Sequence, residues 1–218
     1  MPFSRRERLE HARLYLVCDD RSDAFLHAAI DGGVDIVQLR MKESSDDAVI
    51  AAAHRFARIC LEQGALLILN DRPDLVLVAQ ADGVHVGQDD VAAVDARRTV
   101  GPDRLVGLST HTPEQVLAAN EADVDYIGVG PVHQTPTKPG RAAVGVELVE
   151  YAARHARVPF FAIGGIAPSN VAGVRAAGAT RIAVVRALTD ANDPGKAARV
   201  LRQKIVAPAE ASVGSASS

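Results

Sequence analysis

A loop over residues 128–140 combines residue types that bind phosphate groups. It follows a short apolar run, residues 125–129, and its glycines and prolines exclude a helix or a central strand. Thr135, Thr137 and Lys138 place hydroxyls and a compact ammonium on this stiffened loop. Such groups suit a phosphate or pyrophosphate better than a neutral ligand. The alternative is a solvated surface turn whose lysine meets no ligand.

Two aspartates, Asp71 and Asp90, each follow a different short apolar run. If these runs are adjacent strands, the two carboxylates lie within reach of one hard cation. One or two carboxylates together with substrate phosphate oxygens is the usual arrangement around Mg²⁺. Asn70 beside Asp71 supports this interpretation. The alternative is that each aspartate caps a helix N-terminus, because Asp71 precedes Pro73 and Asp90 precedes a predicted helix.

Basic side chains follow another apolar run. Arg40 and Lys42 alternate with Leu39 and Met41, so on a strand they project to one side and can cover an anion. The alternative is an exposed pair in ion pairs with nearby acids. Gln38, polar within the same run, is predicted to bind a heterocycle through paired hydrogen bonds; otherwise it is a satisfied polar residue in the interior.

Three further sites could contact a polar or phosphate-bearing ligand. Ser109 follows an apolar run, and Gly164-Gly165 follows the next but one. Backbone N–H groups at a glycine pair near the end of a parallel strand commonly bind phosphate. Arg186 adds a positive charge to such a phosphate. Its alternative is a surface cation paired with Asp190.

Acid–base and nucleophilic chemistry find little support. His85 lies between apolar residues and is predicted to be a core histidine, while His133 has no acidic neighbour in sequence. No Ser-His-Asp order, Cys-His pair or zinc spacing occurs. Cys18 and Cys60 lie far apart in apolar runs and are expected to be buried free thiols.

All these residues follow strands of one repeating pattern, in which a short apolar strand precedes a loop and an amphipathic helix. Strands are predicted at residues 14–18, 35–39, 66–69, 83–86, 105–108, 125–129, 160–163 and 182–185. Helices are predicted at residues 23–31, 44–64, from 73, at 91–98, from 112, at 146–155, 168–178 and 194–204.

Continuous apolar strands that alternate with helices indicate a parallel sheet covered by helices. Eight units in this length predict a single (β/α)₈ TIM barrel over residues 1–206, an α/β fold with a parallel eight-stranded core. A doubly wound open sheet is the alternative. In a barrel the site forms at the C-terminal ends of the strands, so the polar residues above should converge. Residues 207–218, rich in Ala, Ser and Gly, are predicted to be a disordered tail.

Composition narrows the function classes. The 218 residues are 48% hydrophobic and carry a net charge of -3, without the basic stripe of a nucleic-acid binder. No apolar run is long enough to span a bilayer, and residues 1–10 lack the hydrophobic segment of a signal peptide. We therefore expect a cytoplasmic enzyme or binding protein for small molecules. The sequence leaves open whether it forms a homo-oligomer.

Taken together, the motifs resemble one known family, the thiamine phosphate synthases (thiamine-phosphate pyrophosphorylases). The resemblance covers residues 14–204, and the motifs occur in this order and at these intervals. They are Gln38-Leu39-Arg40-Met41-Lys42, Asn70-Asp71, Gly83-Val84-His85-Val86-Gly87-Gln88-Asp89-Asp90, Gly107-Leu108-Ser109, the loop from Gly130-Pro131 to Thr135-Pro136-Thr137-Lys138, and Ile163-Gly164-Gly165-Ile166. Each motif alone is weak, whereas the ordered set is specific.

The resemblance implies a transferase of thiamine biosynthesis. Such an enzyme joins 4-amino-2-methyl-5-hydroxymethylpyrimidine diphosphate to hydroxyethylthiazole phosphate or to its 2-carboxy form. It releases thiamine phosphate and pyrophosphate, and the reaction requires Mg²⁺. In the implied mechanism the diphosphate leaves first, the ring amino group stabilises a pyrimidinylmethyl cation, and the thiazole nitrogen attacks it. This chemistry depends on charge stabilisation and positioning rather than on a strong base.

The resemblance also implies roles for residues of this chain. Asp71 and Asp90 match Mg²⁺ ligands. Residues that match pyrimidine diphosphate contacts are Gln38, Leu39, Arg40, Met41, Lys42, Asn70, Ser109 and Lys138. Residues that match the thiazole phosphate site are Thr135, Pro136, Thr137, Gly165, Val185 and Arg186. Those implied to be catalytic are Arg40, Lys42, Ser109 and Lys138. The one departure is Arg186, where family members carry a small hydroxyl residue.

Two rival functions remain. A thiazole tautomerase, a related barrel, isomerises the thiazole carboxylate phosphate and needs neither the acid pair nor the cations. The presence of Asp71, Asp90, Arg40 and Lys42 argues against it. The other rival is a non-catalytic barrel that binds a phosphate ligand and regulates a partner.

Overall fold

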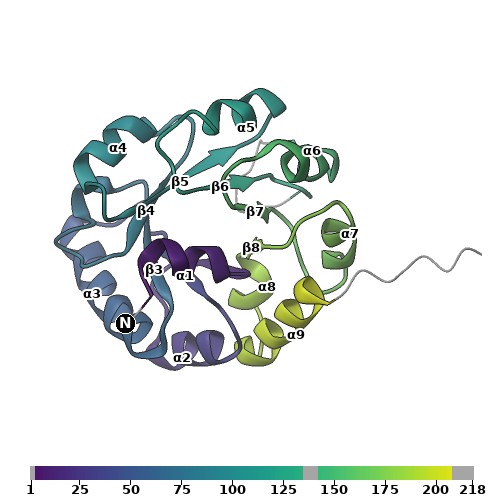
Figure 1. The fold of residues 1–218 in the computed structure, drawn as a ribbon. Helices are drawn as coiled ribbons and strands as arrows, with labels where there is room; N and C mark the ends of the chain where they lie inside the picture. Colours follow the sequence, from purple (N-terminus) through teal and green to yellow (C-terminus); the bar gives the residue numbers. More distant parts are fainter. Residues whose placement is uncertain (1–2, 135–141, 208–218) are drawn as a thin grey trace, which may run out of the picture.

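The computed structural model describes residues 3–134 and 142–207, and its centre is a closed barrel of eight parallel strands (Figure 1). The strands are β1 (Leu14–Cys18), β2 (Ile36–Leu39), β3 (Leu66–Asn70), β4 (Gly83–Val86), β5 (Leu105–Thr110), β6 (Tyr126–Val129), β7 (Phe160–Ile163) and β8 (Ile182–Val184). Each strand pairs with the next, and β1 pairs with β8. The predicted TIM barrel is confirmed, and the open sheet is excluded.

Helices surround this barrel, and α1 lies across its N-terminal end (Figure 1). They are α1 (Arg5–His11), α2 (Asp23–Asp31), α3 (Asp46–Gln63), the 3₁₀ turn η1 (Pro73–Leu75), α4 (Ala93–Val100), α5 (Pro113–Ala119), α6 (Glu147–His155), α7 (Val171–Ala176), α8 (Arg186–Thr189) and α9 (Pro194–Val206). Among the helices of the described residues, none combines the length and apolar character that crossing a membrane requires.

Local sequence signals account for several helix boundaries. Ser45 caps α3 by accepting a hydrogen bond from the N–H of Ala48, and Gly64 ends that helix with φ 76°. Thr112 caps α5, with Pro113 in its first turn. These boundaries follow from the cap and breaker residues alone.

The structure differs from the sequence prediction in three elements. The helix expected at Pro73 is wrong: the chain forms only η1 and returns to β4 through turns, with Gln80 at φ 56°. α1, ahead of the first strand, and the four-residue α8, directly after β8, were not predicted. The tail is described only as far as Ala207, and residues 208–218 lie outside the described residues, so their disorder stays a prediction.

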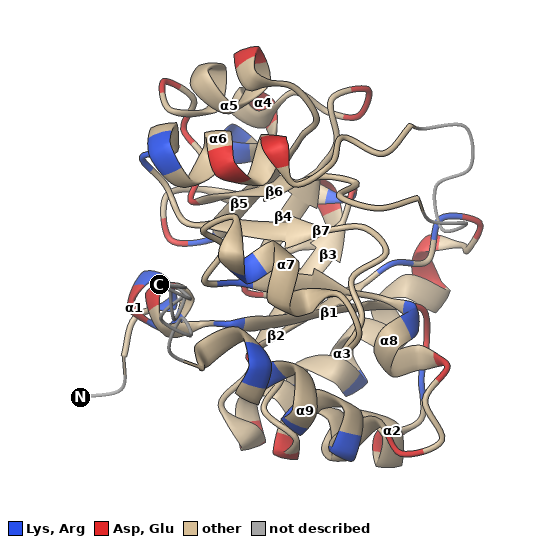
Figure 2. Ribbon diagram, turned by 90° about the vertical axis from the view of Figure 1, so that its right-hand side faces the viewer, with Lys and Arg blue, Asp and Glu red and all other residues tan. Residues whose placement is uncertain are grey.

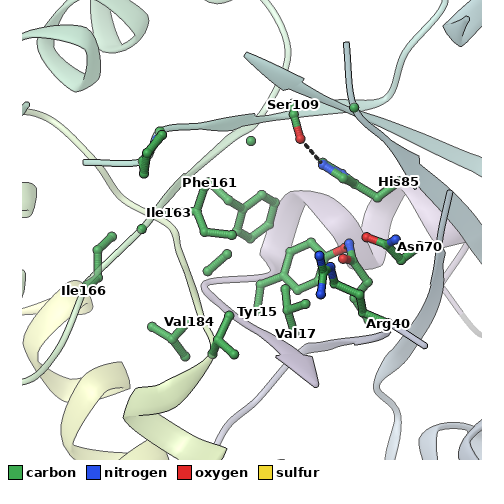
Figure 3. Close-up of a pocket in the computed structure, with 18 of the residues that line it drawn as sticks. Tyr15, Val17, Arg40, Asn70, His85, Ser109, Phe161, Ile163, Ile166 and Val184 are labelled. Carbon is green, nitrogen blue, oxygen red and sulfur yellow. Dashed lines mark hydrogen bonds between the residues drawn. The ribbon is translucent and has the colours of Figure 1, made fainter. Parts of the chain in front are cut away.

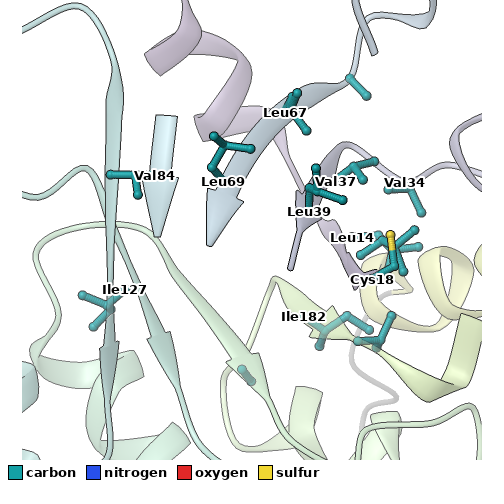
Figure 4. Packing of buried hydrophobic residues seen from close by; sticks show 14 of the residues in the cluster. Leu14, Cys18, Val34, Val37, Leu39, Leu67, Leu69, Val84, Ile127 and Ile182 are labelled. Carbon is teal, nitrogen blue, oxygen red and sulfur yellow. The ribbon is translucent and has the colours of Figure 1, made fainter. Parts of the chain in front are cut away.

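Strand alternation divides the apolar residues into two layers. Val37 and Leu39 face outward and pack between the barrel and its helices, together with Leu14 and Val84 (Figure 4). An inner cluster fills the barrel itself. Its members are Leu9, Ala12, Tyr15, Val17, Ile36, Leu66, Ile68, Leu105, Tyr126, Phe161 and Ala183. Because this cluster fills the N-terminal part of the barrel, the cavity formed by the described residues lies at the C-terminal ends of the strands.

Helix α1 and three aspartates close the N-terminal end of the barrel. Leu9 of α1 is 2% exposed and belongs to the inner cluster. Asp35, Asp82 and Asp125 directly precede β2, β4 and β6, and each carboxylate accepts a backbone N–H from the preceding strand. Each also pairs with arginine. The arginines are Arg202 for Asp35, Arg5 for Asp82, and Arg6 and Arg97 for Asp125.

Candidate active site

A cavity of about 300 Å³ opens at the C-terminal ends of the strands (Figure 3). Every strand contributes at least one lining residue, and the deep wall is aromatic. Tyr15, Tyr126 and Phe161 contact one another there, with ring centroids 5.3 to 5.9 Å apart. The polar lining residues include Gln38, Arg40, Lys42, Asn70, Asp71, Asp90 and Ser109. The predicted convergence of these side chains on one face is therefore observed.

Asp71 follows β3 directly and points into this cavity. Its carboxylate accepts a hydrogen bond from Asn70 Nδ2 at 2.6 Å and pairs with Lys42 Nζ at 2.9 Å. Its backbone adopts φ 62°, an unusual conformation for a residue other than glycine that is typical of functional sites. Asp71 is not a helix cap, because Arg72 occupies the N-cap position of η1 and makes no side-chain cap bond.

Asp90 lines the same cavity from the turn after β4. Its carboxylate accepts the N–H of Gly87 at 2.9 Å. Helix α4 begins at Ala93 with Ala92 as its N-cap, so the capping alternative is wrong here as well. Both carboxylates thus remain candidates for binding a cation.

The oxygen atoms of Asp71 and Asp90 fit a hard cation that a bound substrate also coordinates. Within residues 3–134 and 142–207, no group of three or more His, Cys, Asp or Glu side chains could hold a metal by itself. Two carboxylates, Asp71 and Asp90, line one cavity, and both supply hard oxygen atoms. A Mg²⁺ ion typically takes one or two carboxylates and completes its shell with substrate phosphates and water.

The cations after β2 lie in the same cavity. Arg40 is half-buried, and its guanidinium has no hydrogen-bond or ion-pair partner among the described residues. Lys42 pairs with Asp71, which follows the neighbouring strand β3, rather than with its sequence neighbours. Leu39 and Met41 lie on the outer side, where they pack in or against the layer beneath the helices. Strand alternation therefore leaves only their backbone for ligand contacts.

Ser109 belongs to a buried polar chain that the sequence did not reveal. Its Oγ lies 2.9 Å from Nε2 of His85 (Figure 3), and Nδ1 of His85 lies 3.3 Å from the hydroxyl of Tyr126. The chain continues to Tyr15 at 2.9 Å and to Gln38 Nε2 at 2.7 Å. Burial raises the pKa of Tyr15 and of Tyr126 far above the usual range, so both phenols stay protonated.

His85 is therefore misplaced by the sequence prediction. It is half-buried and lines the cavity instead of lying within the apolar core. The signal that could have revealed this is the pair of glycines on the next strands. Gly107 lies opposite His85 in the register, and Gly107 and Gly128 leave the imidazole room.

The opposite wall is formed by the glycine pair after β7. Gly164 has φ 106° and Gly165 has φ 63°, and a Cβ added at Gly164 would lie 2.4 Å from Pro131 Cα. The start of the loop after β6 runs alongside, because Val132 N–H donates to Ile163 O at 2.8 Å and His133 N–H to Gly164 O at 3.0 Å. Positions 164 and 165 thus both require glycine.

Val185 and Arg186 line the cavity beside this wall. Arg186 is the first residue of α8, its side chain is 60% exposed, and its Nε lies 2.8 Å from an oxygen of Asp190. The structure therefore shows the surface ion pair that was the alternative for Arg186, at a position that also borders the cavity.

The central loop is described only in part. Pro131 and Gln134 line the cavity. Thr135, Pro136, Thr137 and Lys138 lie outside the described residues. The phosphate contacts predicted for them from the sequence stay predictions.

Comparisons with known proteins agree with the geometry. Residues 14–188 match a family model described as thiamine monophosphate synthase. A curated thiamine-phosphate synthase from Saccharopolyspora erythraea is 49% identical over 217 residues, covering 93% of this chain and 97% of that protein. One from a Synechococcus species is 47% identical over 208 residues, covering 92% of this chain but 59% of its own length. The chain thus spans only about three fifths of that relative.

A solved structure extends the comparison to three dimensions. It is described as a thiamine phosphate pyrophosphorylase from Pyrococcus furiosus and superposes with a TM-score of 0.82 at 28% identity. The superposition covers 92% of this chain and 96% of that one. The likeness in fold therefore extends over nearly the whole of both chains.

Proposed function

Since this chain belongs to the thiamine monophosphate synthase family, we propose that it catalyses the transfer of a pyrimidinylmethyl group. The donor is 4-amino-2-methyl-5-hydroxymethylpyrimidine diphosphate, and the acceptor is hydroxyethylthiazole phosphate or its 2-carboxy form. The products are thiamine phosphate and pyrophosphate. When the 2-carboxy form is the acceptor, its carboxylate also leaves as carbon dioxide and a proton takes its place on the thiazole ring. Relatives that bear the name thiamine-phosphate synthase support this activity.

The observation that carries the proposal is the division of one cavity into two differently charged walls. Arg40, Lys42 and two carboxylates line one side, while Gly164 and Gly165 form the other. The first side suits a diphosphate accompanied by a cation, and the second suits a monophosphate on backbone N–H groups. Two anionic groups bound at these walls bring the reacting atoms together over the aromatic floor.

The reaction needs no proton transfer at the reacting atoms. The bond between the methylene carbon and the diphosphate oxygen breaks, and its electron pair leaves with the diphosphate. The lone pair of the thiazole nitrogen then forms the new carbon–nitrogen bond. The protein must stabilise negative charge that grows on the leaving oxygen, which is the role of Arg40, Lys42 and Ser109. It must also hold the acceptor close, which replaces a bimolecular encounter.

The apolar part of the cavity protects the electrophilic carbon. Tyr15, Phe161 and Ile163 line the cavity between the two walls. An apolar lining excludes water, which would otherwise capture the pyrimidinylmethyl cation and yield the alcohol. Gln38 donates its amide N–H to Tyr15, so its carbonyl oxygen is the part of the amide left to accept from the ring amino group.

Asp71 and Asp90 are the residues that would hold Mg²⁺. A bound Mg²⁺ would neutralise part of the diphosphate charge. Lys42, which pairs with Asp71 at 2.9 Å, is held beside this position and contributes a second positive charge to the same group. For the other phosphate, the proposed contacts are Thr135, Pro136, Thr137, Gly165, Val185 and Arg186. Lys138 is the further cation proposed for the diphosphate.

The test is pyrophosphate release by the purified chain with both substrates and Mg²⁺. Release coupled to thiamine phosphate, and absent when either substrate or Mg²⁺ is omitted, is the expected result. Isomerisation of the carboxylated thiazole phosphate without joining would instead identify a tautomerase. Binding of either ligand with no turnover would identify a non-catalytic barrel. Comparing the two thiazole acceptors decides which one is preferred.

A further inference from the structure

A chain of hydrogen bonds crosses the barrel along the inner lining of the cavity. It runs from Gln38 on β2 through Tyr15 on β1 and Tyr126 on β6 to His85 on β4 and Ser109 on β5. Of these residues, Gln38, Tyr15 and Tyr126 are buried, each exposing 4% or less. Each polar atom in such a place needs a partner, because an unmatched buried donor or acceptor is costly.

With the Gln38 amide nitrogen facing Tyr15 as in the structure, only one direction of this chain gives each of its protons an acceptor among the described residues. The amide nitrogen Nε2 of Gln38 can only donate hydrogen bonds, so the hydroxyl oxygen of Tyr15 accepts a hydrogen bond from it. Among the described residues, the only other partner of the Tyr15 hydroxyl is Tyr126, so Tyr15 donates to Tyr126. Tyr126 must then donate to Nδ1 of His85.

This direction determines the tautomer of His85. Because Nδ1 accepts, the neutral imidazole carries its proton on Nε2. Nε2 lies 2.9 Å from Ser109 Oγ and donates to it. The hydroxyl oxygen of Ser109 is thus occupied by an incoming N–H, and its own proton is left for the cavity.

The barrel makes room for this arrangement through missing side chains. A Cβ at Gly107 would lie 2.5 Å from His85 Nδ1 and 2.2 Å from Tyr126 Cζ. A Cβ at Gly128 would lie 3.4 Å from His85 Cε1. Glycine on β5 and β6 thus lets a phenol and an imidazole meet inside the barrel, where larger residues would separate them.

We propose that Gln38, Tyr15, Tyr126 and His85 are positioning residues that fix the Ser109 hydroxyl as a hydrogen-bond donor to the substrate. The inference deepens the proposed function and rests on it for the acceptor, an oxygen of the leaving diphosphate. Ser109 then stabilises growing negative charge, and His85 does not act as a base toward Ser109. This suits a reaction in which the leaving group needs charge stabilisation and no proton is removed.

The opposite direction has a distinct chemical meaning. If the Gln38 oxygen accepted from Tyr15, each bond would reverse, and Nδ1 of His85 would carry the proton. Nε2 would then accept from Ser109, and the pair would resemble a serine activated by a base. The position of one proton on His85 therefore separates a donor serine from an activated one.

The first experiment is ¹⁵N NMR of the histidine-labelled protein without substrates at neutral pH. The signals of His85 are those lost in His85→Asn. We expect a neutral ring with its proton on Nε2, and a mixture of tautomers in Tyr126→Phe, since the Tyr126 hydroxyl then no longer donates to Nδ1. A proton on Nδ1 in the unsubstituted protein, or no change in Tyr126→Phe, would overturn the proposal.

The second experiment is steady-state kinetics. Tyr126→Phe should lower kcat about tenfold, the usual size of one hydrogen bond's effect, with a smaller change in KM for the pyrimidine diphosphate. Tyr15→Phe should lower kcat about threefold, since Tyr126 keeps its proton for His85. Tyr151→Phe, on α6 and outside the cavity lining, is the matched control and should leave kcat unchanged. Equal kcat values in Tyr126→Phe and the control would overturn the proposal.

The two experiments also separate this inference from the proposed function. If the unsubstituted protein released no pyrophosphate, the proposed function would fail while NMR still decided the direction of the chain. If the enzyme were active and His85 carried its proton on Nδ1, the function would stand and the positioning role would fail.

Discussion

The two ends of the barrel carry similar charges but pair them differently. Figure 2 shows acidic and basic residues at both ends, with α1 at one end and the loops after the strands at the other. At the α1 end, each of the three aspartates before an even strand meets both a backbone N–H and an arginine. At the cavity end, among the described residues, Arg40 has no hydrogen-bond or ion-pair partner, and the Asp90 carboxylate accepts a hydrogen bond only from the backbone of its own turn.

The same residue types thus stabilise the fold at one end of the barrel and are available for ligand binding at the other. Saturated carboxylates such as Asp125, whose side chain is 8% exposed, have no capacity left for a ligand. A half-buried charged side chain without a partner in the described part of the protein, such as Arg40, lowers the free energy of unfolding unless a ligand of opposite charge binds to it. Substitutions at the two ends should therefore separate unfolding free energy from turnover.

The largest effect is expected from Asp125→Ala at the α1 end. Asp125 accepts from Val106 N–H at 2.8 Å and pairs with Arg97 at 2.5 Å, and the Arg97 side chain is only 10% exposed. Its removal takes the closer carboxylate from this guanidinium, which keeps Asp123 at 3.4 Å and two backbone carbonyl oxygens, and it leaves the Val106 N–H without its acceptor. The free energy of unfolding should therefore fall by about 3–5 kcal/mol. Urea unfolding measures this loss. Turnover per folded molecule should stay normal, and a stability change below about 1 kcal/mol would contradict the structural role.

The next largest effect is expected from Asp71→Asn at the cavity end. Asparagine tolerates the backbone conformation at φ 62° but removes the negative charge. Turnover should fall about 10²–10³-fold, while the free energy of unfolding stays within about 0.5 kcal/mol. Asp90→Asn should behave in the same way. Asp47→Asn, exposed in the first turn of α3, is the charge-matched control, and normal turnover in both site variants would refute the cation assignment.

Local sequence patterns predicted most of the residues that meet at the cavity end. Strands and caps follow from short-range signals such as Ser45, Gly64 and Thr112, and eight repeats imply a closed barrel. Closure alone places residues that follow strands, such as Asp71 and Asp90, at one rim. The prediction therefore needed the number of strands but not their detailed packing.

What the sequence could not supply depends on contacts between distant segments. The pairing of Asp82 with Arg5 joins residues 77 positions apart, and that of Asp35 with Arg202 joins residues 167 apart. The place of His85 depends on its register with Gly107, which is set only when all the strands have paired around the barrel. The two ion pairs leave no periodic or short-range trace, and the trace of the His85 position, Gly107 and Gly128, lies on other strands.

A third test refines the comparison within the cavity end. Lys42 is 44% exposed and pairs with Asp71, so Lys42→Ala removes one charge from a group of several. We expect kcat/KM for the pyrimidine diphosphate to fall about tenfold, KM for the thiazole phosphate to stay constant, and stability to change by less than about 1 kcal/mol. Steady-state kinetics with each substrate varied in turn measures this. A larger effect on the thiazole KM would mean that the two walls are assigned in reverse.

The smallest effect is expected at Arg186, where the two kinds of charge meet. Arg186 borders the cavity, yet its side chain is 60% exposed. It also forms an ion pair with Asp190, as the arginines at the α1 end do with their aspartates. Because an exposed, paired and screened charge contributes little, Arg186→Ser should raise KM for the thiazole phosphate no more than about threefold. Asp190→Asn is the informative partner variant, since it frees Arg186 and should lower that KM slightly at low salt. A rise of tenfold or more in Arg186→Ser would show that Arg186 binds the phosphate despite its ion pair, because the loss of a surface pair alone cannot produce it.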